Sequence, residues 1–206
     1  MKCFLCYIFF LLGWWQVVGQ NDFMGIAKYK LTVEGSDNPV TDSMSVIFSK
    51  QKVEVILYLP DLTTTSRISE KIFIDDFKTK TIITLNTENK TYKTDTLNTI
   101  PKYEFTNTNK IAAGNNMLCF RYTVDSTKID TSLSRVECLA SIDYRNSFTS
   151  NYFFLGIQPI IIDNRIVIDY IITKIGGGKQ RIYITDIKKM ENVESYFNLS
   201  GYKQEK

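Results

Sequence analysis

The sequence predicts a mainly β protein made of antiparallel strands, and three observations support this. From residue 25 onward, apolar and polar side chains alternate with a period of two, as on a strand with one buried face. Thr, Ile, Val, Tyr and Phe, which favour pleated sheets, are abundant. Turn-forming residues separate these runs at spacings of roughly 8 to 12 residues. We therefore expect about ten strands in a sandwich, a barrel or a strongly curved sheet.

Residues 1–19 form a hydrophobic leader. Lys2 is its single charge, residues 3–15 are apolar, and Val17 and Gly19 fit the −3 and −1 positions of a signal-peptidase site. We expect a signal peptide over 1–19, one β-rich domain over 20–206, export to the periplasm or outside, and no integral membrane span after cleavage. The alternative is a retained anchor, for which the apolar stretch has about the minimum length that spans a bilayer.

Alternating apolar and polar residues predict the strands in chain order. The first run places Ala27, Tyr29, Leu31 and Val33 on one face. Similar runs follow at Met44, Val46 and Phe48; at Val53, Val55, Leu57 and Leu59; at Ile72 and Ile74; at Ile83 and Leu85; and at Ile166, Ile168, Tyr170 and Ile172. Residues 185–196 fit either a short amphipathic helix or a final strand. Gly176, Gly177 and Gly178 lie between two strand-like runs, so we expect a hairpin turn there and no phosphate loop, which needs a following helix.

Cys119 and Cys138 are the two cysteines that follow the leader. They lie in alternating runs at 117–124 and 134–142, on either side of a polar stretch. In a symmetric hairpin they face each other across the strands, at a separation that a disulfide accepts. Because export permits disulfides, we expect a bridge between Cys119 and Cys138. Two buried reduced thiols are the alternative, and the role is structural in both cases.

Residues 151–162 (NYFFLGIQPIII) form the most apolar segment after the leader. Gly156 and Pro159 interrupt a regular strand there, and the apolar run is too continuous for a sheet with one wet face. Two interpretations stay open. The segment is either a core strand with a bend or a lid over a hydrophobic cavity.

The composition argues against most catalytic and metal chemistry. The chain has no histidine, which excludes His-containing triads and zinc patterns. Adjacent Asp75 and Asp76 would point to opposite faces of a strand, while Asp163 and Asp169 are expected on separate strands, so we interpret all four as solvated surface acids. We expect no enzyme activity, cofactor or metal. With 25 basic and 22 acidic residues, the charge does not indicate nucleic-acid binding.

The order of several short segments resembles the secreted Bacteroidota proteins grouped as GLPGLI-type and LolA-like (lipoprotein-carrier-like). The likeness covers most of the mature chain and rests on the Cys119 strand and on residues 25–29 (GIAKY), 49–53 (SKQKV), 72–76 (IFIDD), 89–92 (NKTY), 156–161 (GIQPII) and 197–203 (FNLSGYK). The chain departs from the pattern where Pro159 is not followed by a second Gly and where Ser200 replaces a usual Pro. The resemblance implies a single strongly curved antiparallel sheet or incomplete barrel, with at most one or two short helices, around an apolar cavity.

Three Asp-Ser/Thr triplets look like the O-glycosylation signal of exported Bacteroidota proteins, which implies possible modification of Ser43, Thr96 and Ser126.

The surplus of apolar side chains without a reactive cluster favours a binding or carrier protein. We expect a lipid or other apolar small molecule on the concave sheet face. The expected lining residues are Tyr29, Leu31, Val55 and Leu57, covered by Phe153, Phe154 and Leu155. The alternative is a structural or accessory protein that docks to another envelope protein through a strand edge or the same apolar segment.

Overall fold

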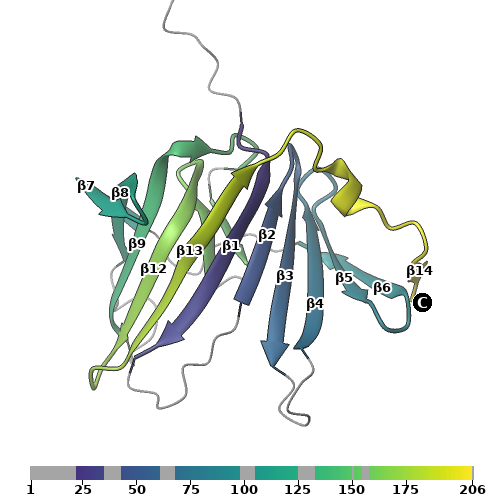
Figure 1. The fold of residues 1–206 in the computed structure, drawn as a ribbon, viewed down its shortest axis with the longest axis horizontal. Helices are drawn as coiled ribbons and strands as arrows, with labels where there is room; N and C mark the ends of the chain where they lie inside the picture. The colour runs from purple at the N-terminus through teal and green to yellow at the C-terminus, as the bar shows by residue number, and fades with distance from the viewer. Residues whose placement is uncertain are drawn as a thin grey trace, which may run out of the picture.

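The computed structural model describes residues 22–34, 43–60, 68–97, 105–124, 133–149, 151–154 and 158–205. They form one open, curled sheet of 14 strands and one short 3-10 helix (Figure 1). Every strand pair in these residues is antiparallel except the short parallel pair at one edge, between β14 and β6. The predicted mainly β fold is confirmed. The expected signal peptide lies outside the described residues.

The elements have the following bounds: β1 (Gly25–Val33), β2 (Ser43–Phe48), β3 (Lys52–Pro60), β4 (Ile68–Asp76), β5 (Thr81–Asn86), β6 (Thr91–Thr96), β7 (Phe105–Gly114), β8 (Met117–Val124), β9 (Leu133–Arg145), β10 (Tyr152–Phe154), β11 (Gln158–Ile162), β12 (Arg165–Lys174), β13 (Lys179–Lys189), η3 (Glu194–Phe197) and β14 (Lys203–Gln204). The strands outnumber the predicted ten because β10 and β14 are too short, and β6 too polar, to show alternation. Residues 185–196 divide between the end of β13 and the short helix η3.

The first strand, β1, and the last long strand, β13, meet at the centre of the sheet. Its order is β14-β6-β5-β4-β3-β2-β1-β13-β12-β9-β8-β7, and β10 and β11 lie off this path. β1 pairs with β13 along its whole length, from Gly25 opposite Lys189 to Val33 opposite Gln180. Figure 1 shows the purple β1 beside the yellow-green β13 in the middle of the molecule.

The two faces of the sheet carry different covers. We call the face that packs against β10 and β11 the inner face, and the opposite one the outer face. Inner-face side chains of β1 to β3 are almost all buried: Ala27, Tyr29, Met44, Val46, Phe48, Val53 and Val55. On the outer face, Ile47 and Ile74 are buried beneath Val193 and Phe197 of the C-terminal segment. That segment runs from the end of β13 through η3 to β14 at the far edge (Figure 1).

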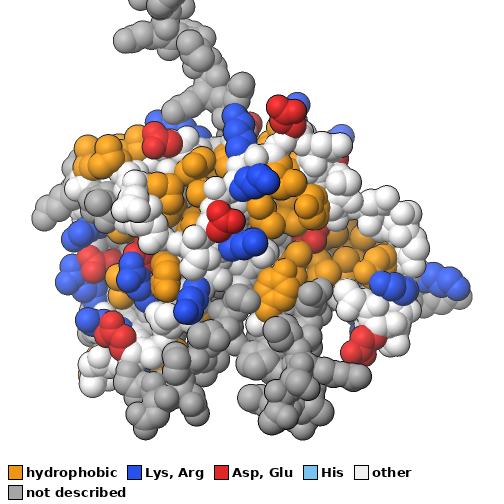
Figure 2. All heavy atoms as spheres, in the orientation of Figure 1, with side chains coloured by type: hydrophobic (Ala, Val, Ile, Leu, Met, Phe, Trp, Pro, Cys, Tyr) orange, Lys and Arg blue, Asp and Glu red, His pale blue; other side chains and the backbone are white. Residues whose placement is uncertain are grey.

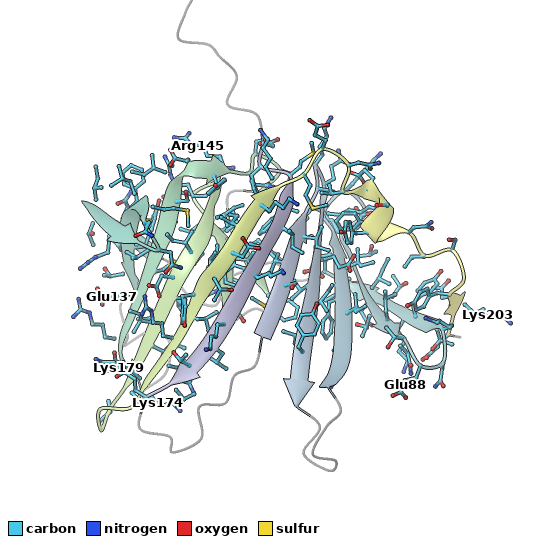
Figure 3. The ribbon with its side chains drawn as sticks, viewed as in Figure 1. Glu88, Glu137, Arg145, Lys174, Lys179 and Lys203 are labelled. Carbon is cyan, nitrogen blue, oxygen red and sulfur yellow. The ribbon has the colours of Figure 1, made fainter. Side chains whose placement is uncertain are left out.

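The glycine cluster forms the predicted hairpin turn between β12 and β13. The amide of Lys174 donates to the carbonyl of Gly178 at 2.8 Å. Gly176 and Gly177 have φ angles of 104° and 94°, which favour residues without a Cβ. Figure 3 shows Lys174 and Lys179 flanking this turn, at the opposite end of the sheet from Arg145.

The predicted disulfide is wrong, because the two cysteines lie on opposite faces of the sheet. Both thiols are free and buried. Cys119 is opposite Ser141, and Cys138 is opposite Tyr122, so the actual register is offset by three residues from the symmetric hairpin. Because the side chains of a strand alternate between faces, an odd offset directs the two sulfurs to opposite sides.

Gly25 is required where β1 begins, because the chain passes closely there. A Cβ atom at this position would overlap the carbonyl oxygen of Lys188 and lie 2.9 Å from the ring of Phe23. At Gly178 a Cβ would meet no heavy atom within 4 Å.

We therefore expect Gly25→Ala to destabilise the protein by about 1 to 3 kcal/mol, the usual cost of forcing extra atoms into a packed site. Urea denaturation measures the change, and Gly178→Ala is the matched control, with a shift within about 0.5 kcal/mol. Equal stability of the Gly25→Ala variant and the wild type would contradict the close approach of β1 and β13 at this point.

Candidate functional site

The apolar segment 151–162 forms a hairpin that covers the inner face. β10 pairs with β11, and β11 continues into β12 through a tight turn at Asp163 and Asn164, which have φ angles of 48° and 59°. All three residues of β10 and the last four of β11 are buried. The segment is thus a second layer of core strands in direct contact with the sheet. Leu155 lies outside the described residues.

Side chains of β10 anchor the hairpin to both halves of the sheet. Phe154 makes an edge contact with Phe73 of β4, with ring centroids 5.2 Å apart, and Tyr152 contacts Phe77 at 5.1 Å. Phe153 joins a second cluster that contains Tyr122 and Cys138 on the other half of the sheet. The hairpin therefore spans the junction between the two halves.

The structure brings together most of the predicted lining residues, but it packs them against the protein itself. Tyr29, Val55 and Phe154 belong to one buried cluster, and Leu57 packs at its border. The hydroxyl of Tyr29 donates to the carbonyl of Val167 at 2.9 Å. The middle of the inner face is therefore filled by the hairpin, and a ligand role for these side chains stays a prediction.

Burial decreases along the inner face toward the end where β12 turns into β13. On β1, Ala27 and Tyr29 are buried whereas Leu31 is half-buried, and on β3 the same change occurs between Val55 and Leu57. Ile182 is opposite Leu31 in the β1–β13 pair and is half-buried. Four half-buried aliphatic side chains define this region, which we call the apolar end: Leu31, Leu57, Ile172 and Ile182.

A buried polar contact holds the hairpin on the sheet. The hydroxyl of Tyr152 donates to Oδ2 of Asp75 on β4, and both residues are buried. Oδ1 of Asp75 has no hydrogen-bond partner among the described residues. Burial raises the pKa of Asp75 from 3.8 to about 6, although the Tyr152 hydrogen bond opposes this shift. Sequence analysis missed this pair because 77 positions separate its members.

A second buried carboxyl lies on the outer face. Glu54 is opposite Ile47 on β2 and Ile74 on β4, in the area that the C-terminal segment covers. Its Oε2 has no hydrogen-bond partner in the described part of the chain. Burial raises the pKa of Glu54 from 4.5 to about 7.

The interpretation of the aspartates as solvated surface acids is wrong for three of the four. Asp75 and Asp76 point to opposite faces as expected, but both are buried. Asp169 is also buried and forms an ion pair with Arg181, with Nη2 and Oδ2 2.6 Å apart. Asp76 accepts from the amides of Lys78 and Thr79 and lies 3.4 Å from Nζ of Lys52. Asp163 is in the exposed turn between β11 and β12.

These pairings leave the acids engaged in structural contacts. Among the described residues, no group of three or more Cys, Asp or Glu side chains is placed to hold a metal ion. No helix in the described ranges is long and apolar enough to cross a membrane. Of the glycosylation candidates, Thr96 is exposed at the end of β6, Ser43 is the first residue of β2, and Ser126 lies outside the described residues.

Comparison with solved structures identifies relatives of the fold. PNGF-II, in two crystal forms, is similar to this chain with a TM-score of 0.55 and sequence identities of 13% and 15%. The match covers 88% and 89% of this chain but 30% and 31% of PNGF-II, so this chain spans less than a third of that protein. At such low identity the likeness concerns the fold alone.

Two further structures align over most of both chains. A LolA superfamily protein from Nitrosomonas europaea has a TM-score of 0.39 at 9% identity and matches 87% of this chain and 91% of its own. A DUF1329 family protein from Desulfovibrio piger has a TM-score of 0.31 at 9% identity, over 89% and 92%. No comparison shows the GLPGLI link. No protein-family model and no curated protein matches the sequence.

The two buried carboxyls make stability depend on pH. Because folding raises the pKa of Asp75 and Glu54, the folded state binds protons more tightly than the unfolded state, and stability falls as the pH rises from about 4 to about 7. Asp75 accounts for about 3 kcal/mol of this loss, at about 1.4 kcal/mol per pKa unit.

Urea denaturation at several pH values measures the slope, which we expect Asp75→Asn to reduce. Asp76→Asn is the matched control, because hydrogen bonds and Lys52 lower the pKa of Asp76. We expect this variant to lose stability between pH 4 and pH 7 as the wild type does. A slope unchanged by Asp75→Asn would contradict the burial of this carboxyl beneath the hairpin.

Proposed function

We propose that this protein is exported through its leader and binds an apolar ligand, such as the acyl chain of a lipid, at the apolar end of the inner face. The observation that carries this proposal is the change in burial along β1, β3, β12 and β13. On each of these strands, a half-buried aliphatic side chain at the apolar end is next to a buried side chain on the same face. Such a surface gains about 0.8 kcal/mol for each CH₂ group that it removes from water.

The hairpin divides the predicted lining residues into two groups. Leu31 and Leu57 are the proposed contacts of the ligand, because they lie at the apolar end. Tyr29, Val55 and Phe154 form the packed wall beside it, since the hairpin already buries them. The proposed role is binding and not catalysis, because the buried acids Asp75 and Asp169 are paired with side chains of the protein itself.

Leu31→Gln and Leu57→Gln test this site. We expect each variant to bind a dansyl-labelled fatty acid about tenfold more weakly than the wild type, because one lost aliphatic contact costs about 1.4 kcal/mol. Fluorescence titration measures the affinity, and thermal unfolding confirms that each variant is folded. Ile175→Gln is the matched control, because this residue is 67% exposed at the β12–β13 turn. The proposal fails if the wild type does not bind saturably or if Ile175→Gln weakens binding equally.

The edge hairpin β7–β8 favours the second candidate function, docking to an envelope protein. Ile111 and Leu118 are 62% and 57% exposed, and their cross-strand partners place them on the same face. In the described sheet β7 pairs only with β8, so its other side is an edge of the sheet to which a further strand can be added.

For this alternative we expect affinity purification from envelope extracts to recover one stoichiometric partner, cross-linked through β7. The double variant Ile111→Lys, Leu118→Lys should lose that partner while keeping its affinity for the fatty acid, since charges replace the exposed apolar contacts. A monomer that recovers no partner, or a partner retained by the double variant, argues against docking through this edge.

A further inference from the structure

A hollow of about 440 Å³ lies on the outer face, on the other side of the sheet from the apolar end. Its outer-face side chains are two lysines and three hydroxyl-bearing residues: Lys28, Lys30, Ser45, Tyr58 and Thr185. Tyr29 and Met44, whose side chains are buried on the inner face, complete the lining. Figure 2 views this face and shows lysine and arginine side chains beside hydrophobic ones over the central strands.

The alternation of β1 places both lysines on this face. Residues 28 and 30 are two positions apart on one strand, so their Cα atoms are about 7 Å apart and their side chains point the same way. Lys28 is opposite Ser45 of β2, whose short side chain is buried and leaves room between the longer side chains of β1 and β3. Tyr58 of β3 is paired with the first residue of β2, which in turn is paired with Lys30.

A bulge in β13 completes the hollow. The register of β1 against β13 shifts between Lys28 and Tyr29, so Thr185 has no partner of its own on β1. The Thr185 hydroxyl donates to the carbonyl of Lys28 at 3.2 Å, and this hydrogen bond holds Thr185 at the edge of the hollow. The hydroxyl oxygen of Thr185 can still accept a hydrogen bond.

Neither lysine of the hollow forms an ion pair with another described residue. Among the described residues, no carboxylate oxygen lies within 4.0 Å of the amine nitrogen of Lys28 or Lys30. By contrast, Lys179 forms an ion pair with Glu34, and Arg181 forms one with Asp169. The acid nearest in register is Asp186, opposite Lys28 across the strands and exposed.

We propose that this hollow binds a phosphate group. Two ammonium groups on one strand match the two negative charges of a phosphate monoester, and lysine binds phosphate as a compact point charge. The hydroxyls of Ser45 and Tyr58 supply neutral donors, and the volume admits the phosphate together with part of the molecule that carries it. The phosphate belongs either to a free ester or to the headgroup of an anionic lipid. The site is independent of the proposed apolar site, because the sheet separates them.

The test compares two double variants with the same loss of charge. Lys28→Gln, Lys30→Gln changes the hollow, whereas Lys188→Gln, Lys189→Gln removes two exposed lysines farther along β13. Amide chemical shifts are followed by NMR during titration with inorganic phosphate and with glycerol 3-phosphate, and thermal unfolding confirms that both variants are folded. We expect saturable shifts around Lys28 and Lys30 that weaken as salt increases, and at least about tenfold weaker binding for the hollow variant but less than a twofold change for the control.

Sedimentation with vesicles distinguishes the two sources of phosphate. Binding to vesicles of phosphatidylcholine with phosphatidylglycerol, but not to pure phosphatidylcholine, together with no response to glycerol 3-phosphate, assigns the hollow to a lipid headgroup. A response to glycerol 3-phosphate without vesicle binding assigns it to a free ester. The proposal is overturned if neither arm binds the wild type, or if the control variant loses binding as much as the hollow variant.

Discussion

The antiparallel pairing of β1 with β13 is the interaction on which the rest of the structure depends. Strands β2 to β6 extend from one side of this pair, and β12, β9, β8 and β7 from the other. Among the described strand pairs, no other backbone ladder connects these two halves. The pair brings residues 25 and 189 together. One continuous curled sheet, and therefore one continuous inner face, exists only because this long-range ladder forms.

The hairpin β10–β11 depends on that continuity, because it packs across both halves. Phe154 and Tyr152 contact β4 and the residue after it, while Phe153 enters the cluster around Tyr122 and Cys138. The hydrogen bond from Tyr152 to Asp75 places one polar contact inside this apolar layer. A buried carboxyl with one unpartnered oxygen is costly to desolvate, so it favours the geometry in which Tyr152 reaches it.

Strand β1 contributes side chains to both proposed sites, the apolar end and the outer hollow. Leu31 of β1 belongs to the inner face and the apolar end, whereas Lys28 and Lys30 belong to the outer face and its hollow. Because neighbouring residues on a strand point to opposite faces, apolar and cationic chemistry lie back to back without mixing. The bulge at Thr185 adjusts the register at this position and shapes the outer hollow.

The sequence by itself determined the mainly β fold, the alternation of β1 to β3, the glycine turn and the opposite directions of Asp75 and Asp76, because these follow from local periodicity and turn chemistry. Tertiary structure decided the register that separates Cys119 from Cys138, the packing of the hairpin on the inner face, and the burial of Asp75 and Asp169. These features depend on which distant strands meet. Hydrophobic alternation marks the face of a residue, but it does not specify its partner strand or its cover.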